Sequence, residues 1–398
     1  MTHALLALAT IAGWLLTGTF EAAIAEEAWV AFASATGILD PRQRLQGARE
    51  ALNRGNALRG AGNIAEAIRA YRRAAWLHPN GGPGHFNPGL ALHETGDWRG
   101  AALAFRHAAR CDARDFRSVQ NVVTTIACAV EADAPRLFPR EVSAGAQGRE
   151  PVSIVVCSTD PGRLAAMRAN FTAALGARQH EFVVIRDAAS LSEGYSRGLR
   201  MARHPIVVFS HDDVELVSPR PFEAFDEALG RHDIVGLAGA RHVGGPAVMW
   251  AGHPHVHGWV AYPETVEGCS ATVFSLESGV IGGMKVLDGM LFAARREAAL
   301  CVGFDAATFD GFHFYDIDFT YRAHLAGLRI AVTTDVIAIH ASHGLFDEEW
   351  RRYAARFMAK FPHLRLPKGE HHAYAAALSS RTRMARFYNE LRGLAAIA

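Results

Sequence analysis

The sequence predicts two domains of different fold class, an all-α helical domain followed by an α/β domain with a mainly parallel sheet. A 34-residue repeat with helical spacing lies near the N-terminus. From Pro151 onwards, short apolar runs alternate with amphipathic stretches, as they do in βαβ units. The residues between these two regions are rich in proline, glycine and charge, which is typical of a linker. The length of 398 residues allows about two to three domains.

The helical domain is expected over residues 1–134, with repeats over about 47–115. GNALRGAGNIAEAIRAYRRAA is echoed by GLALHETGDWRGAALAFRHAA, and each copy indicates helix, turn and helix. Small residues lie where the helices would cross, and Tyr71 or Phe105 is the expected packing residue of each copy. The period and these positions resemble the tetratricopeptide repeat. Because such repeats need about three copies or caps, residues 116–132 are expected to form a capping helix.

A linker is expected at 135–150, the α/β domain at 151–362, and a further helix or surface tail at 363–398. The α/β domain begins as strand, helix, strand, helix and strand, expected at 152–158, 163–175, 181–185, 191–203 and 205–210. Residues 233–304 are rich in glycine and aromatics and resemble loops that cover a substrate, with a later strand expected within VLDGMLFAARREA, residues 286–298. A helix is expected over 347–361.

Composition excludes several classes of protein. The net charge is +1 and no basic run is interleaved with aromatics, which argues against a nucleic-acid partner. The five cysteines are odd in number and never form CxxC, which favours free thiols in the cytoplasm. The uncharged stretch Ala4 to Phe20 is shorter than a membrane span and lacks the basic start of a signal peptide. We expect it to form a buried or amphipathic helix, with a peripheral contact to the inner membrane as the alternative.

Asp212 and Asp213 follow an apolar strand over Ile206 to Phe209. In open α/β sheets, ligands bind beyond the carboxyl ends of the strands. Carboxylate oxygens suit the hard cations Mg²⁺ and Mn²⁺, which in turn bind diphosphate oxygens. The alternative is a polar turn, where adjacent acidic residues are common. The two aspartates are therefore candidates for a metal and phosphate site.

Asp316 and Asp318 lie at the start of a helix expected over Ile317 to Ala326. Asp316 can serve as the helix N-cap, and it can also serve as a general base for a hydroxyl nucleophile. The two roles are compatible, since a helix N-terminus favours the ionised carboxylate. Asp318 lies inside the first turn, where we expect it to bond the backbone or hold a loop.

His340 is expected to close a strand over Ile330 to Ile339, and His343 follows it. A neutral imidazole can complete a metal shell that carboxylates begin. A histidine at a strand end can equally be a hydrogen-bonded loop residue. Its distance from Asp212 decides between the two.

Two further strand ends carry polar residues. Asp187 follows the strand EFVVI, and Ser158 and Thr159 follow VSIVVC. Both ends would face the same crevice as Asp212, so these residues are candidates for contacts to the base and ribose of a nucleotide. Turn formation is the alternative for each.

Other motifs are weak or missing. His253, His255 and His257 alternate in a pattern that imitates a zinc site, but Pro254 argues for a loop. The sequence contains no GxxxxGK[ST], GxGxxG or GxSxG motif, which disfavours kinases, dehydrogenases and hydrolases with a nucleophile elbow.

The distinctive segments of the α/β region are, in chain order, VSIVVCSTD, EFVVIRD, SLSEGYSRGLRMARHPIVVFSHDDVEL, VLDGMLFAARREA, GFDAATFDGFHFYDIDFTYRAHLAGLRI and IAIHASHG. With these segments, Val152 to about Phe361 resembles a glycosyltransferase of the family 2 type with the GT-A fold. HDDVEL and GFHFYDIDF resemble the subgroup related to streptomycin-biosynthesis proteins.

This resemblance implies transfer of a sugar, hexosyl or related, from a nucleoside-diphosphate sugar to a hydroxyl of a glycan, small molecule or protein. It implies a divalent metal, Mn²⁺ or Mg²⁺, held with the diphosphate by Asp212 and Asp213. It further implies that Asp316 is the catalytic base, that Asp187 contacts the nucleobase, and that His340 touches metal or phosphate.

The chain departs from the family pattern at two places. The first strand ends in Cys157-Ser158-Thr159-Asp160, where the family has a Pro-Thr-aromatic turn. Ser210 replaces the first aspartate of the usual DxD, so either metal binding is weaker or Asp213 compensates. A single base candidate without a carboxylate nucleophile is consistent with inversion at the sugar.

Two alternatives remain at this point. The repeats could bind a protein partner while the transferase-like domain is degenerate, which would make the protein a non-catalytic adaptor. A nucleotidyltransferase would share the α/β crescent and the acidic metal site, but it needs a glycine-rich first loop with arginine, which Ser158 to Arg163 barely provides.

Overall fold

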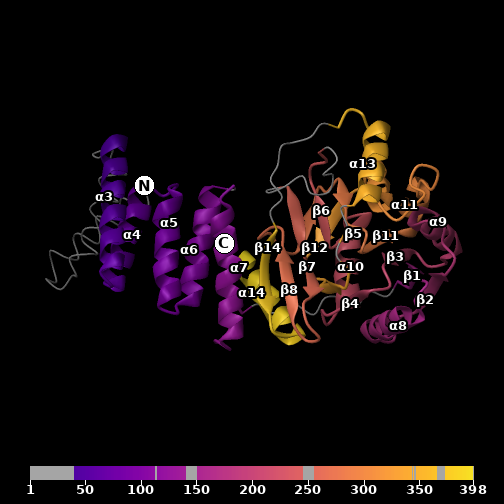
Figure 1. Ribbon diagram of the computed structural model, residues 1–398, viewed down its shortest axis with the longest axis horizontal. Helices are drawn as coiled ribbons and strands as arrows, with labels where there is room; N and C mark the ends of the chain where they lie inside the picture. Colours follow the sequence, from indigo (N-terminus) through magenta and orange to yellow (C-terminus); the bar gives the residue numbers. More distant parts are fainter. Residues whose placement is uncertain are drawn as a thin grey trace. The chain divides into compact units, whose positions relative to one another are not determined.

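The chain divides into two compact units in the computed structural model, with the division between Val122 and Val123 (Figure 1). The described residues are 40–112, 114–139, 150–244, 255–342, 344, 347–364 and 373–397. The stretch Ala4 to Phe20 lies outside them. The division falls inside a helix, earlier than the boundary at residue 134 that the sequence suggests.

The described part of the first unit is helical, as predicted. Its helices are α3 (Pro41–Gly60), α4 (Ile64–Leu77), α5 (Gly82–Glu94) and α6 (Trp98–Cys111), and α7 (Phe116–Glu131) crosses the division. Tyr71 and Phe105 are fully buried. A Cβ on Gly55 would lie 2.4 Å from the ring of Tyr71, and one on Gly89 would lie 2.7 Å from Phe105. The small residues therefore let the helices approach where the sequence suggests, while the repeat type stays a prediction.

The second unit contains a mixed sheet whose parallel core matches the predicted βαβ pattern. Its strands are β1 (Val152–Cys157), β2 (His180–Ile185), β3 (Ile206–Ser210), β5 (Ile234–Gly236), β9 (Val280–Gly282), β11 (Leu291–Arg295) and β12 (Ile330–Thr333). Their order is β2-β1-β3-β11-β5-β12-β9. β1 is parallel to both β2 and β3, whereas β11 runs antiparallel to β3. The carboxyl ends of β1 and β3 and the start of β11 therefore share one edge.

Helices cover both faces of this sheet (Figure 1). They are α8 (Pro161–Leu175), α9 (Leu191–Met201), α10 (Pro221–Leu229), α11 (Arg296–Val302), α12 (Tyr315–Leu325) and α13 (Glu348–Lys360). Side chains alternate along a strand. Val156 of β1 accordingly packs with α8 and α10, and Val155 packs in a separate core with α9 and α12. The helix expected over 347–361 is confirmed as α13.

A second sheet is built largely from the region that the sequence suggested was loops. Its strands are β4 (Val214–Leu216), β6 (Ala238–Ala240), β7 (Val256–Pro263), β8 (Cys269–Val273), β10 (Val286–Leu287), β13 (Ala338–His340) and β14 (Tyr374–Leu378). The loop interpretation is therefore wrong where β6, β7 and β8 lie, whereas the strand expected within residues 286–298 is found as β10 and β11. Most of these strands are short or buried along their whole length, so they lack the alternation of apolar and polar residues by which strands are recognised.

The single strand expected over Ile330 to Ile339 is two strands in two sheets. β12 ends at Thr333, whose side-chain oxygen accepts a hydrogen bond from the Asp335 amide at 3.3 Å. β13 then starts at Ala338 and pairs with β4. This turn carries His340 out of the first sheet to the end of β3.

Of the two alternatives for residues 363–398, a further helix or a surface tail, the structure shows the helix, preceded by a strand. β14 extends the second sheet beside β8, and α14 (Arg381–Ala396) buries most of its apolar side chains. The α14 carboxylate of Glu390 accepts hydrogen bonds from the amides of Leu137 and Phe138, at 3.1 and 2.8 Å. The start of the expected linker is thus anchored in the second unit.

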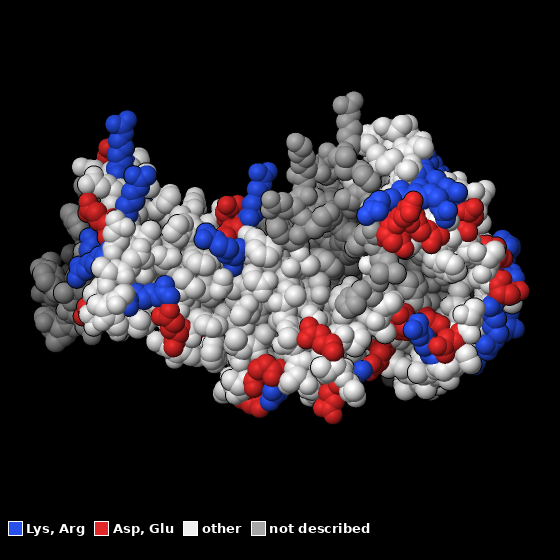
Figure 2. Space-filling view, viewed as in Figure 1, with Lys and Arg blue, Asp and Glu red and all other residues white. Residues whose placement is uncertain are grey.

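Positive and negative side chains lie interspersed on the visible face (Figure 2). Among the described residues, many charged side chains form ion pairs, such as Arg356 with Asp310 and Arg352 with Glu349. All five cysteines are free, as expected. Among the described helices, none combines the length and apolar character that a membrane span requires.

Two glycines provide a stability test of the second sheet. Gly258 in β7 has φ +112° and a Cβ there would lie 2.0 Å from the Leu237 carbonyl oxygen, whereas Gly279 has φ +81° and open space around it. We expect Gly279→Ala to cost about 1 kcal/mol of unfolding free energy through backbone strain alone. Gly258→Ala should cost about 3 kcal/mol or more, because strain and a backbone clash add. Urea unfolding followed by circular dichroism measures both, and equal costs would contradict the packing described for β7.

Candidate active site

The site forms where β1, β3 and β11 meet at one sheet edge. Ser158, directly after β1, donates a hydrogen bond of 2.6 Å from its hydroxyl to the Asp212 carboxylate, directly after β3. The amide of His211 donates to the Met290 carbonyl at the start of β11, at 2.9 Å. The ends of three strands are thereby tied together, and the polar residues that follow them share one edge, as the sequence predicted.

A group of three side chains at this edge could hold a metal ion. His211, Asp213 and His340 each offer one ligand atom, and these atoms all lie within 4.8 Å of one another. Nδ1 of His211 is 3.2 Å from Nε2 of His340, which is 3.4 Å from a carboxylate oxygen of Asp213. The strand pairing of His340 with Val214, and a backbone bond from Ala341 to Asp213, fix these distances.

The spacing and chemistry of this group fit a divalent cation. Ligand atoms at about 2.0–2.1 Å from a four-coordinate ion lie about 3.3 Å apart, close to the two distances found here. Two imidazoles and one carboxylate suit Mn²⁺ and its neighbours in the first transition row. Asp213 and His340 therefore lie where the sequence predicted metal ligands, and His211 joins them. Asp212 lies outside the group and bonds Ser158 instead.

The protonation states favour metal binding. Burial, together with the adjacent His340, lowers the pKa of His211 to about 4, so its imidazole is neutral at pH 7. Burial alone would raise the pKa of Asp213, but its bond with His340 and further contacts hold that pKa well below the usual range. A neutral imidazole and an ionised carboxylate are the forms that bind metal.

Asp316 lies in the first turn of α12 and titrates near neutrality. Burial and the nearby Asp288 raise the pKa of Asp316 to about 7, although amides of Ile317, Asp316 and Gly289 bond the carboxylate and oppose the rise. The helix-terminus effect expected from the sequence is therefore outweighed by desolvation. A carboxylate with a pKa near the working pH is suited to accept a proton.

Asp316 is not the N-cap of its helix. That position belongs to Phe314, which has φ 64° and is buried against Trp350 and Phe357 of α13. Asp316 is the second residue of the helix, two positions after Phe314. A left-handed phenylalanine is costly and persists only where its surroundings fix it.

Asp318 forms structural contacts, although with side chains rather than with the backbone. Its side chain is 1% exposed and bonds Arg322 at 2.7 Å and Lys360 at 2.6 Å. Lys360 also bonds Asp305 at 2.7 Å. These contacts join α12, α13 and the segment before α12.

The remaining predicted residues are more peripheral. Thr159 is exposed. Asp187 is exposed and pairs with Arg197 at 2.7 Å, which lowers the pKa of its carboxyl group. His257 is buried in β7 beside Glu277, at 3.6 Å, and forms no cluster of metal ligands with the other described residues. His253 and His343 lie outside the described residues.

Four site residues escaped the sequence reasoning. They are His211, Asp288, Tyr315, whose hydroxyl lies 2.7 Å from Nε2 of His211, and Ser342, whose hydroxyl lies 3.1 Å from Nε2 of His340. His211 lies two positions before Asp213, but a turn over residues 212–213 separates the two, so their spacing alone gave no signal. Asp288 and Tyr315 both lie within distinctive segments, next to Gly289 and Asp316. Only the folded chain shows that they reach the end of β3.

Residues 166–361 match the model of a family described as "Glycosyltransferase like family". This segment is therefore similar to that glycosyltransferase-like family. No curated protein sequence matches the chain significantly.

Two solved structures are similar to parts of the chain. GalNAc-T7 with UDP, GalNAc and Mn²⁺ has 10% identity and a TM-score of 0.34, over 50% of this chain and 45% of that protein. This chain thus spans less than half of the length of GalNAc-T7. A mannosyltransferase from Pyrobaculum calidifontis in complex with GDP-Man and Mn²⁺ has 14% identity and a TM-score of 0.35, over 75% of this chain and 81% of that one. Similarities at this level establish no function for the chain.

Measurements of metal binding distinguish the ligand set in the structure, which includes His211, from the set suggested by the sequence, which includes Asp212. We expect His211→Ala and His340→Ala each to weaken Mn²⁺ binding by at least about 10-fold, because each removes one of three ligands. Asp212→Ala should change the affinity by less than about 3-fold, since its carboxylate bonds Ser158. Calorimetric titration of the purified chain with Mn²⁺ tests this. Loss of binding in Asp212→Ala but not in His211→Ala would restore the ligand set suggested by the sequence.

The raised pKa of Asp316 predicts a pH-dependent cost in stability. Between pH of about 4 and 7 the folded chain keeps the Asp316 proton and the unfolded chain releases it, so unfolding becomes easier as pH rises through this window. Asp316→Asn removes this loss. The difference in Tm between Asp316→Asn and wild type should therefore grow in favour of the variant from pH 4 to pH 8. A difference that does not change with pH would show that Asp316 has an ordinary pKa.

Proposed function

We propose that the second unit is a GT-A glycosyltransferase that moves a sugar from a nucleoside-diphosphate sugar to an acceptor hydroxyl with inversion. The observation that carries the proposal is the pairing, at one sheet edge, of Asp316 with the group His211, Asp213 and His340. This edge belongs to a segment that matches a glycosyltransferase-like family. Proton acceptance and metal binding are the two tasks that such a transfer requires.

Asp316 accepts the proton of the acceptor hydroxyl. The hydroxyl oxygen then bonds to the anomeric carbon while the bond from that carbon to the diphosphate oxygen breaks, and the diphosphate leaves with the electron pair. One displacement of this kind inverts the configuration, and Asp316 is the base candidate that the site offers. Its pKa of about 7 leaves a large fraction ionised and ready at neutral pH.

His211, Asp213 and His340 would hold a divalent metal, Mn²⁺ or Mg²⁺, and the two imidazoles favour Mn²⁺. When bound, the metal offsets charge on the departing diphosphate. GalNAc-T7 and the Pyrobaculum mannosyltransferase were both solved with Mn²⁺ and a nucleotide or nucleotide sugar, which agrees with this assignment. Asp212, bonded to Ser158, is left to orient the strand ends and contact the donor.

The donor is proposed to extend along the ends of β1 and β2. Ser158, Thr159 and Asp187 follow these strands and would contact the ribose and base. The exposed carboxylate of Asp187 is held by Arg197, which orients it without burying it. A hexosyl or related donor sugar fits the family resemblance.

The helical unit is proposed to be of the tetratricopeptide type and to bind the acceptor or a protein partner. The acceptor would be a glycan, a small molecule or a protein. A degenerate adaptor is disfavoured, because the base and the metal group are both intact in the site. Five free cysteines support a cytoplasmic location.

Release of nucleoside diphosphate from a panel of nucleotide sugars, with and without Mn²⁺ or Mg²⁺, tests the function. We expect Asp316→Asn to lower kcat about 10²- to 10⁴-fold, because it removes the proton acceptor. In wild type, kcat/KM should rise as pH increases through 7 and level off about one pH unit above it, since only the ionised carboxylate is active. Glu297→Gln, which neutralises an exposed carboxylate on α11, serves as the control. Unchanged turnover in Asp316→Asn would rule out this base.

A further inference from the structure

Tyr315 links the metal group to the helix that carries the base. Its hydroxyl oxygen lies 2.7 Å from Nε2 of His211, the ring nitrogen that does not face His340. Tyr315 is the first residue of α12 and immediately precedes Asp316. One short hydrogen bond therefore connects a candidate metal ligand to the first turn of α12, the helix that carries Asp316.

We propose that Tyr315 is a positioning residue, which holds His211 with Nδ1 free to bind the metal and couples that ligand to the position of Asp316. The proposal rests on the proposed function, since it gives a role to a residue beside the same site. A neutral imidazole carries one proton, so a metal at Nδ1 requires the proton at Nε2. Nε2–H then donates to the Tyr315 oxygen, which accepts.

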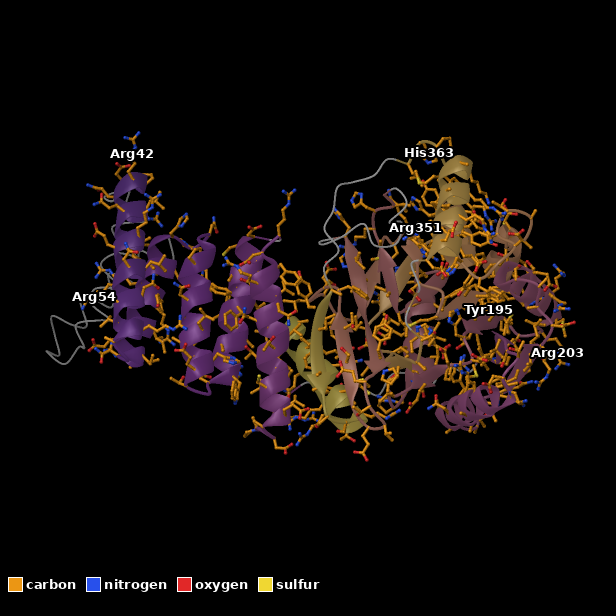
Figure 3. All side chains as sticks on the ribbon, viewed as in Figure 1. Arg42, Arg54, Tyr195, Arg203, Arg351 and His363 are labelled. Atoms are coloured by element: carbon orange, nitrogen blue, oxygen red, sulfur yellow. The ribbon has the colours of Figure 1, made fainter. Side chains whose placement is uncertain are left out.

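The phenol has little freedom to leave this position. Tyr315 is 4% exposed, and the ring of Tyr195 packs against it edge-on, with 5.4 Å between ring centroids. A Cβ on Gly289 would lie 2.1 Å from the Tyr315 hydroxyl oxygen and 2.7 Å from the Cβ of Asp316. Tyr195, from α9, is labelled in the interior of the second unit (Figure 3). The loop before β11 and α9 thus hold Tyr315 from two sides.

The shared helix start has a mechanical consequence. Tyr315 and Asp316 are consecutive, so a displacement of the first turn of α12 moves the partner of His211 and the base together. Outer partners of ligating histidines fix ring orientation, and their loss typically weakens metal binding about 10- to 100-fold. A hydroxyl that only filled space beside His211 would have no such effect.

Tyr315→Phe keeps the ring and removes the hydroxyl. We expect Mn²⁺ affinity, measured by calorimetry or electron paramagnetic resonance without a donor, to fall about 10- to 100-fold. Tyr353→Phe is the matched control, because Tyr353 is also a buried tyrosine, and its hydroxyl bonds Asp310 rather than a member of the candidate metal group. Its Mn²⁺ affinity should equal that of wild type. Equal affinity in Tyr315→Phe and wild type, or an equal loss in Tyr353→Phe, would overturn the proposal.

A measurement on wild type alone provides an independent test if Tyr315→Phe does not fold. In ¹⁵N NMR of the metal-free chain, His211 should carry its proton on Nε2, and a proton on Nδ1 would overturn the proposal. In Tyr315→Phe the two tautomers should mix. Release of nucleoside diphosphate by wild type is a separate readout. If it occurs while Tyr315→Phe binds Mn²⁺ normally, the transferase stands and the role of Tyr315 falls.

Discussion

The pairing of β3 with its two neighbours is the constraint on which the site depends. Parallel pairing with β1 sets Val156 opposite Ser210, and antiparallel pairing with β11 sets Leu291 opposite Ser210. The three strands therefore end or begin at the same level, and the next residues meet. The His211 amide, which has no partner within β3, is satisfied by the Met290 carbonyl of the neighbouring chain segment. Without this register, the candidate metal ligands His211, Asp213 and His340 would not lie beside the start of α12.

Burial at this edge acts on two carboxylates in opposite directions. Asp213 contacts two imidazoles, and its bond with His340 keeps the carboxyl ionised despite desolvation. Asp316 faces Asp288 instead, so desolvation and like charge together bring its pKa to about 7. Two aspartates on one edge thus acquire different protonation behaviour from their neighbours alone. Carboxyl groups with different pKa values allow a site to bind a cation with one carboxylate and to accept a proton with another.

The sequence was sufficient where the pattern was local. Apolar runs predicted β1 and β3, polar residues at strand ends pointed to Asp213 and His340, and the start of a helix pointed to Asp316. The sequence was not sufficient where the position of a site residue depends on pairing between strands that are distant in the chain. The turn between β12 and β13 moves His340 to the second sheet, and the antiparallel return of β11 brings Asp288 beside Asp316. Consecutive residues after a strand also cannot be ranked as ligands from spacing alone, because the local turn decides which side chains face His340.

The position of Asp316 depends more on α13 than on the helix propensity of its own segment. Phe314 adopts a left-handed conformation that an isolated chain would avoid, and its ring is buried against α13. Asp318, four residues after Phe314, is buried and would be costly as a lone charge, but Lys360 and Arg322 both bond it. Removing either cation would leave that charge less compensated and free the first turn. A base that must lie within hydrogen-bond reach of an acceptor hydroxyl needs such support, since small displacements cost catalysis heavily. In the proposed function, α13 would therefore support the base without supplying a reacting group itself.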